Sequence, residues 1–120
     1  MDVKTVKNSK STQLKKGDIS KLQKHITANI RKWGFEDETL QERLLLLTEE
    51  LGELVNACRK ISGMNVDTKR EIKNEVGEEV ADIINLVFAV AIKLGLDVES
   101  DYLKKEEVVN KRIYIRTETK

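Results

Sequence analysis

The stretch TLQERLLLLTEELGELVNACRKISG, residues 39–63, determines the fold class. Its apolar residues recur at steps of three and four, at Leu40, Leu44, Leu47, Leu51, Leu54, Cys58 and Ile61. This period gives an α-helix a single apolar stripe. Thr39 and Glu42 have the spacing of a capping box, and Gly63 ends the pattern. We therefore predict a long amphipathic helix that packs against other helices through its stripe.

Three further segments have a similar helical period. In segment 18–34 the apolar residues are Ile19, Leu22, Ile26, Ile30 and Trp33. In segment 68–95 they are Ile72, Val76, Val80, Ile83, Val87, Val90 and Leu94. A last helix is expected from about residue 97 to about residue 113, with Tyr102, Leu103 and Val109. Together these segments predict an all-α protein, an antiparallel bundle of about four helices.

The expected ends of these helices come from capping residues. Asp18 can cap the first helix, because a carboxylate at that position accepts hydrogen bonds from free backbone N–H groups. Thr68 and Glu71 repeat the capping box before the third stripe. Gly34 and Gly95 stop the first and third helices, since glycine readily adopts the left-handed conformation at a helix end.

Composition agrees with a helical protein. Of the 120 residues only 4% are aromatic, none is Pro, and a β-sandwich would need more aromatic and β-branched residues. The net charge of +1 gives no reason to expect binding to nucleic acid or to a membrane surface. Cys58 is the single cysteine, which excludes an internal disulfide and fits a reducing cytosol. With no long apolar stretch and no signal peptide, we expect a cytoplasmic protein.

The chain is expected to form one helical domain over residues 18–115. Residues 1–17 are rich in Lys, Ser and Thr and predict a flexible basic tail, with a nucleic-acid arm as the alternative. Residues 116–120 are a short C-terminal tail. The run from Leu44 to Leu47 points in all directions around its helix, which indicates burial on several sides. We therefore expect assembly as a dimer or a dimer of dimers.

Acidic residues cluster at two places in the helical domain. The seven residues are Glu49, Glu50, Glu53, Glu75, Glu78, Glu79 and Asp82. None of the seven has Lys or Arg three or four residues away, although a solvated helix face normally offsets its charges at this spacing. Two acidic surface patches would cost only roughly 1–3 kcal/mol, which a protein tolerates. The alternative is a cation site.

Helical geometry favours the cation site. At about 100° per residue, Glu50 and Glu53 lie roughly 60° and 120° from Leu47, which marks the core direction of their helix. Glu79 and Asp82 lie roughly 40° and 100° from Ile83 on the other helix. Both clusters therefore lie beside the buried stripe, where uncompensated carboxylates are costly. If the helices pack antiparallel, these four carboxylates can converge.

The type of ligand narrows the choice of metal. Carboxylate oxygens suit Mg²⁺ or Mn²⁺, whereas zinc and copper sites use His and Cys. His25, the single histidine, is on another helix and is expected to be an ordinary surface side chain. A carboxylate-bound Mg²⁺ keeps positions open for phosphate oxygens, which points to chemistry on phosphate esters or anhydrides.

The acidic motifs resemble a known family. EELGEL at 49–54, EEVADIINLV at 78–87 and KLGLDVE at 93–99 are similar to the MazG-type nucleoside triphosphate pyrophosphohydrolases of the all-α NTP pyrophosphatase superfamily. The family signature is EExxE followed downstream by ExxD. The resemblance implies Mg²⁺-dependent hydrolysis of (d)NTPs to the monophosphate and pyrophosphate, by helical subunits assembled as homodimers or homotetramers.

The resemblance also implies roles for individual residues. The positions that match the metal ligands are Glu50, Glu53, Glu79 and Asp82. The remaining acids, Glu49, Glu75 and Glu78, would bind a further Mg²⁺, support the ligands or activate water. The expected substrate-binding residues are Asn85, Lys105, Asn110 and Lys111. Lys105 and Lys111, however, both have acidic i,i+4 partners, so an ordinary charged surface is an equal alternative for these two and for Lys104 and Arg112.

Several alternatives remain open at this stage. Trp33 could stack on a nucleobase, but an aromatic residue on an apolar stripe favours a core position. Related enzyme classes with the same acidic layout are phosphoribosyl-ATP pyrophosphatases and dUTPase-like enzymes. The alternative from another class is a non-catalytic helical interaction module, although a scaffold gains nothing from acids that lack a basic residue three or four positions away in the sequence.

Overall fold

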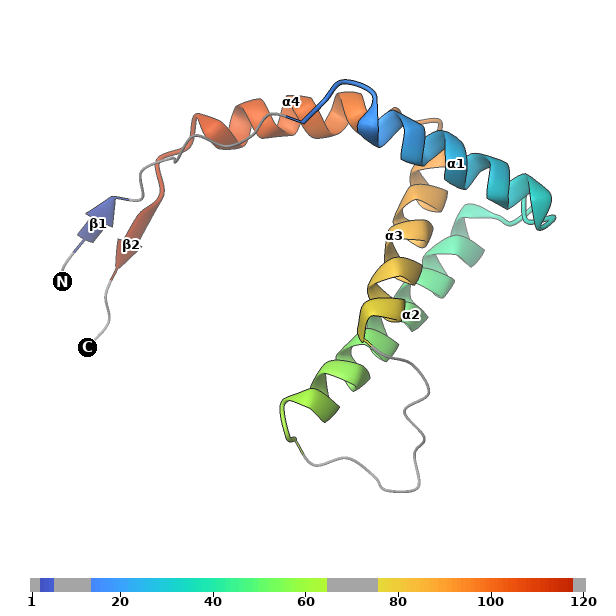
Figure 1. Cartoon of the computed structure of the whole chain (residues 1–120), viewed down its shortest axis with the longest axis horizontal. Coiled ribbons are helices and arrows are strands. Elements are labelled where there is room, and N and C mark those ends of the chain that lie inside the picture. Colours follow the sequence, from blue (N-terminus) through green and yellow to red (C-terminus); the bar gives the residue numbers. More distant parts are fainter. Residues whose placement is uncertain (1–2, 6–13, 65–75, 118–120) are drawn as a thin grey trace.

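The computed structural model describes residues 3–5, 14–64 and 76–117. The order of elements is β1 (Val3–Thr5), α1 (Asp18–Lys32), α2 (Leu40–Ile61), α3 (Val76–Lys93), α4 (Val98–Asn110) and β2 (Ile115–Thr117). Figure 1 shows how these helices and strands are arranged. The predicted all-α class is confirmed, and the helices follow the four segments that the apolar period marks out.

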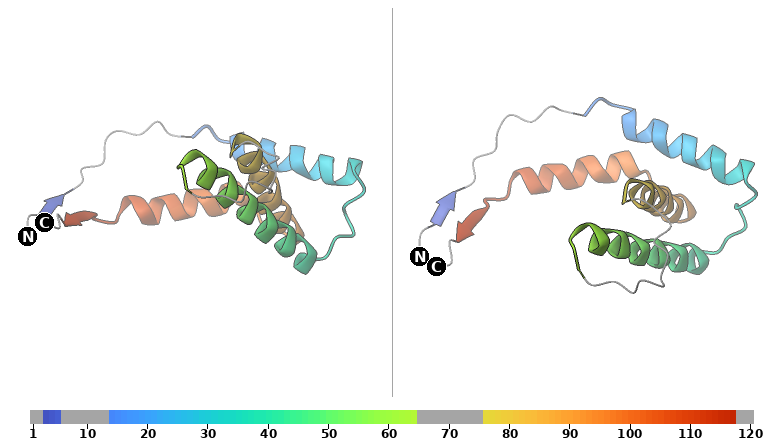
Figure 2. Two further views of the ribbon diagram at one scale, coloured as in Figure 1. Left: turned by 90° about the horizontal axis from the view of Figure 1, so that it is seen from below. Right: turned by 60° about the horizontal axis from the view of Figure 1, so that its bottom comes forward.

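The helices α2 and α3 lie side by side and antiparallel, and α1 crosses the end of this pair that holds the C-terminus of α3 (Figures 1 and 2). The buried core is small. Ile26 and Ile30 of α1 pack against Ala89 of α3, and Phe88 and Ile92 lie partly buried around them. This core packs α1 against α3. The helices α2 and α3 also contact each other, and the acidic residues lie further along this second contact.

Local capping signals predicted two helix starts correctly. The Thr39 hydroxyl accepts a hydrogen bond from the Glu42 backbone N–H at 3.1 Å, so the predicted N-cap is confirmed. The Glu42 carboxylate accepts from the Thr39 hydroxyl at 3.2 Å, whereas in a full capping box it would accept from the Thr39 backbone N–H. The predicted start near Asp97 is also confirmed, since Asp97 is the N-cap and accepts from the Ser100 N–H at 3.1 Å. The second capping box, Thr68 with Glu71, lies outside the described residues.

The predicted cap at Asp18 is wrong. The N-cap of α1 is Gly17, whose φ of 100° lies in the left-handed region that favours glycine. The carboxylate that serves this end comes from α4, because Glu99 Oε1 accepts from Gly17 N–H at 2.8 Å and from Ser20 N–H at 3.4 Å. A second hydrogen bond joins the same two helices. The Gln23 side-chain oxygen of α1 accepts from the backbone N–H of Val98, at the start of α4, at 3.0 Å. The two helices are therefore fastened to each other at their N-terminal ends.

The helix α4 extends away from the α2–α3 pair and leads to the strands (Figure 2). It ends at Asn110, earlier than the predicted end near residue 113. Its main contacts with another helix in the described chain are with α1. The strands β1 and β2 pair antiparallel, with Val3 opposite Thr117 and Thr5 opposite Ile115. The apolar pattern did not predict this pairing.

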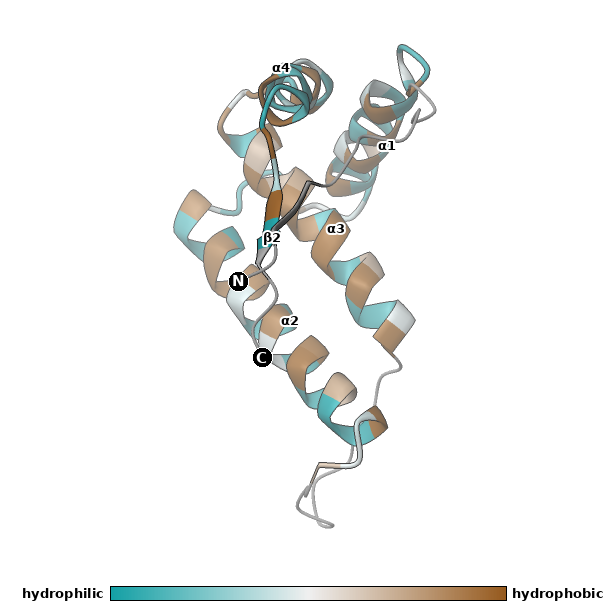
Figure 3. Cartoon of the chain, turned by 90° about the vertical axis from the view of Figure 1, so that its left-hand side faces the viewer, coloured by the Kyte–Doolittle hydropathy of each residue, from teal (hydrophilic) through white to brown (hydrophobic). Residues whose placement is uncertain are grey.

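Many large apolar side chains are exposed in the single chain. Leu45 is 71% exposed, Ile61 is 76% exposed, and Figure 3 shows that apolar residues recur along the whole length of α2 and α3. Trp33 is 54% exposed, so the prediction that it belongs to the core of the chain is wrong. Among the described residues, no helix is both long and apolar enough to span a membrane.

Candidate metal-binding site

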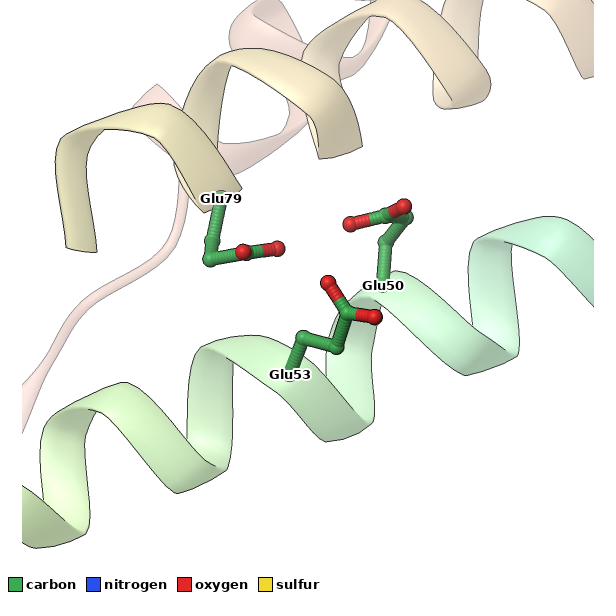
Figure 4. A group of neighbouring side chains, drawn as sticks. All are labelled: Glu50, Glu53 and Glu79. Carbon is green, nitrogen blue, oxygen red and sulfur yellow. The ribbon is translucent and has the colours of Figure 1, made fainter. Parts of the chain in front are cut away.

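Three carboxylates converge between α2 and α3. Glu50 and Glu53 lie on one side of α2, and Glu79 faces them from α3 (Figure 4). One oxygen from each residue lies within 4.8 Å of the others. The three residues are contributed by the two acidic motifs, and the antiparallel packing of the helices brings the motifs together.

The innermost of the three carboxylates is Glu79. Its side chain is only 1% exposed, yet, apart from a proton on the neighbouring Glu50, neither of its oxygens has a hydrogen-bond donor in the described chain. Glu50 Oε2 is also buried without a partner. An ionised carboxylate in such surroundings is costly, because neither water nor a donor compensates its charge.

A proton partly compensates this charge. The pKa of Glu50 is raised to about 7 by a hydrogen bond with Glu79, by burial, and by the negative charges of Glu53, Asp82 and Glu79. Two ionised carboxylates have no donor between them, so this hydrogen bond forms only when Glu50 carries the proton. The Glu50 carboxyl therefore holds a proton close to neutral pH, at a place where a cation would also remove the repulsion.

The arrangement fits a hard divalent cation. Oxygen ligands from two helices point to one place, and the two buried residues offer oxygens that no protein donor occupies. Mg²⁺ and Mn²⁺ prefer such carboxylate ligands, and among the described residues no His or Cys joins the group. The donor set therefore suits the predicted ion.

The structure places the other predicted acids at the margin of this group. Asp82 is exposed, less than one turn along α3 from Glu79, and lies close enough to Glu50 to raise its pKa. Glu49 is exposed on α2, where it lines a pocket of about 710 Å³ with Glu38, Glu42, Leu45, Leu46, Thr48 and Gly52. Glu78 is exposed on α3, and Glu75 lies outside the described residues.

The predicted substrate-binding residues do not gather at the carboxylates of the same chain. Lys105 and Asn110 are exposed on α4, Lys111 follows at its C-cap, and α4 points away from the acidic group (Figure 1). Asn85 is exposed on α3. Trp33 lies at the C-terminal end of α1, 6.4 Å from Phe35 between ring centroids.

Sequence reasoning missed one buried residue on α2. Arg43 is 2% exposed and donates from Nη1 to the backbone oxygen of Ala89 at 2.6 Å. The apolar pattern does not include Arg43, because a charged residue is normally interpreted as a surface position. A signal was present, however, since Arg43 precedes Leu47 by four residues and Glu50 by seven, which places all three on one helical face.

Comparison with known proteins supports the fold. No protein-family model matches the sequence, and no curated protein matches it. The crystal structure of iMazG from Vibrio DAT 722 is similar, with a TM-score of 0.55 and 30% sequence identity. The alignment covers 79% of this chain and 99% of that chain. With 30% identity over nearly the whole of iMazG, the chain belongs to the MazG family.

Proposed function

We propose that the protein is a Mg²⁺-dependent nucleoside triphosphate pyrophosphohydrolase that cleaves (d)NTPs to the monophosphate and pyrophosphate, with Mn²⁺ as a substitute ion. The observation that carries this proposal is the buried Glu79 carboxylate, which faces Glu50 and Glu53 and has no donor of its own. The similarity to iMazG supports the same reading, because the aligned chain has the same fold.

The acids of the site have distinct proposed roles. Glu50, Glu53, Glu79 and Asp82 hold the metal ion, which when bound neutralises the negative charge of the triphosphate. One of Glu49, Glu75 and Glu78 takes a proton from the attacking water. The water oxygen then forms a bond to the α-phosphorus, and the bond to the leaving pyrophosphate breaks. Glu49 and Glu78 are exposed next to the metal ligands, which gives both of them access to water.

The substrate-binding residues are proposed to act in a homo-oligomer. Lys105, Asn110 and Lys111 lie on an extended α4 away from the carboxylates of their own chain, so we propose that they approach the triphosphate at the site of another copy. Asn85 and Trp33 remain candidates for contacts with the nucleotide. The exposed apolar residues of α2 support a homodimer or homotetramer.

Pyrophosphate release from a panel of (d)NTPs, measured with Mg²⁺ and with excess EDTA, tests the proposal. We expect cleavage of at least one nucleotide with Mg²⁺ and none with EDTA. Glu79→Gln should lower kcat at least about 100-fold, because an uncharged amide replaces a proposed ligand. Glu107→Gln is the matched control, since Glu107 is exposed on α4.

The same panel separates the competing functions. Including dUTP and phosphoribosyl-ATP distinguishes a dUTPase-like enzyme or a phosphoribosyl-ATP pyrophosphatase from a broader (d)NTP hydrolase. Absence of cleavage of every nucleotide, together with no change in melting temperature on adding Mg²⁺ and nucleotide, would favour a non-catalytic interaction module.

A further inference from the structure

The buried guanidinium of Arg43 has an unusual environment. Nη1 donates to the Ala89 carbonyl at 2.6 Å, Nη2 donates to the Phe35 carbonyl at 3.2 Å, and Nε has no partner. Within the described ranges, Arg43 makes no salt bridge. Burying an arginine without a carboxylate is costly, and an apolar side chain of similar size often gives equal or greater stability. General stability therefore does not explain why α2 carries arginine here.

The two hydrogen bonds join three parts of the fold. Arg43 belongs to α2, Ala89 to α3 and Phe35 to the turn between α1 and α2. The rigid, planar guanidinium donates in fixed directions, so it specifies where α2 lies along α3. Apolar packing between two helices is non-directional and specifies this position less strictly. A shift by one turn, about 5.4 Å, is a known type of helix movement.

The position of Arg43 matches the register of the carboxylates. Ten residues separate Arg43 from Glu53 on α2, and ten separate Glu79 from Ala89 on α3. Because the helices are antiparallel, equal spacings place the Arg43–Ala89 hydrogen bond and the Glu53–Glu79 pair in the same register. The spacing of seven residues from Arg43 to Glu50 is likewise matched by that from Asp82 to Ala89.

The carboxylates themselves do not hold this register. When both are ionised, Glu50 and Glu79 have buried oxygens without donors, and negative charges at this distance repel each other. We propose that Arg43 is a positioning residue that fixes the register of α2 against α3 and thereby keeps the carboxylates of both helices at metal-binding distance. The part of this inference that concerns the metal rests on the proposed function.

Two measurements on Arg43→Met and Arg43→Lys test the proposal. The first is Mn²⁺ affinity, measured by electron paramagnetic resonance of the free ion. The second is the distance between spin labels on Thr48→Cys of α2 and Ile84→Cys of α3, in a Cys58→Ser background. Thr48 and Ile84 are exposed, and neither is one of the proposed metal ligands. Arg31→Met is the matched control, because the Arg31 side chain is 70% exposed and pairs only loosely with Glu36, at 3.9 Å.

We expect Arg43→Met to weaken Mn²⁺ binding by roughly 10-fold or more, the usual effect of losing a residue that orients metal ligands. The label distance should shift or broaden by up to about 5 Å, one helical turn. Arg43→Lys keeps the positive charge but not the planar guanidinium. Its Mn²⁺ affinity and its label distance should therefore lie between those of Arg43→Met and those of the wild type. It also replaces Arg43→Met if that variant does not fold. Arg31→Met should match the wild type in both measurements.

Failure of the positioning role is distinguishable from failure of the metal site. An unchanged label distance in both Arg43 variants overturns the proposal, and so does a changed distance with undiminished Mn²⁺ affinity. If the wild type binds no Mn²⁺, the proposed function fails, while the label distances still decide whether Arg43 fixes the register.

Discussion

At the scale of single residues, the carboxylate site lowers the stability of the folded chain. Glu79 is buried without a donor, and Glu50 holds a proton at a pH where glutamate is normally ionised. Proteins tolerate such groups chiefly where function requires them. The clearest consequence is that removing charge should stabilise the metal-free protein and destroy its proposed activity at the same time.

Glu79→Gln should therefore raise the free energy of unfolding in EDTA by about 1–3 kcal/mol, because the amide donates to the unpartnered Glu50 oxygen. Urea denaturation with EDTA and with Mg²⁺ measures this effect. Mg²⁺ should stabilise the wild type more than the variant, since it binds the complete carboxylate group. A variant that is less stable than the wild type in EDTA would contradict the idea that the Glu79 charge is uncompensated.

Glu50 makes the stability of the metal-free protein depend on pH. Its pKa is raised from 4.5 to about 7 in the folded chain, so the folded state binds a proton that the unfolded state has lost. The contribution of Glu50 to stability should therefore be fully present below pH 4.5 and should fall as pH rises towards 7. Urea denaturation of the wild type and Glu50→Gln across this range should show a decline in the wild type that the variant lacks.

The same proton competes with the metal. Below the pKa of Glu50, Mn²⁺ affinity should fall by up to about tenfold per pH unit, because binding the ion displaces one proton. Titrations with Mn²⁺ at several pH values measure this dependence. An affinity that stays constant between pH 5.5 and 7.5 would show that Glu50 is not a ligand.

At the scale of elements, the arrangement of α1 and α4 depends on contacts that are distant in sequence. Glu99 caps the N-terminus of α1, and Gln23 holds the turn before α4. Glu99→Ala should lower the free energy of unfolding by about 1–2 kcal/mol, as the loss of an N-cap does. Asp18→Ala is the contrasting variant. Asp18 lies in the first turn of α1 without capping it, so this substitution should lower the free energy of unfolding by less than Glu99→Ala does. Chemical denaturation compares the two, and equal losses would contradict the role of Glu99.

This difference between elements explains how far the sequence predicted the structure. The cap at Thr39 was predictable because donor and acceptor are three residues apart on one segment. The convergence of Glu50, Glu53 and Glu79 was predictable because helical period and antiparallel packing restrict where side chains point. The cap from Glu99 and the burial of Arg43 were not predictable from the sequence. Each depends on a partner that is distant in sequence and comes close only when the chain folds.

At the scale of the whole molecule, the single chain leaves much apolar surface on α2 and α3 uncovered. Leu45 is 71% exposed and Ile61 is 76% exposed, whereas the buried cluster found among the described residues consists of Ile26, Ile30 and Ala89. Exposed apolar surface of this extent is typical of an interface with another molecule. We propose that a second copy covers it, because a second copy would also bring Lys105 and Lys111, on and just after α4, to carboxylates that lie away from α4 in their own chain.

Leu45→Glu tests this assembly. Burying a leucine contributes about 1.5–3 kcal/mol, so placing a charge there should weaken self-association by at least about tenfold. Sedimentation velocity should show a shift towards monomer, and pyrophosphate release should fall in parallel, because Lys105 and Lys111 act on the partner's site in the proposed assembly. Lys21→Glu, an exposed change on α1, is the control for added negative charge. A monomeric Leu45→Glu that keeps full activity would show that each chain completes its own site, and α4 would then have to fold back onto α2 and α3.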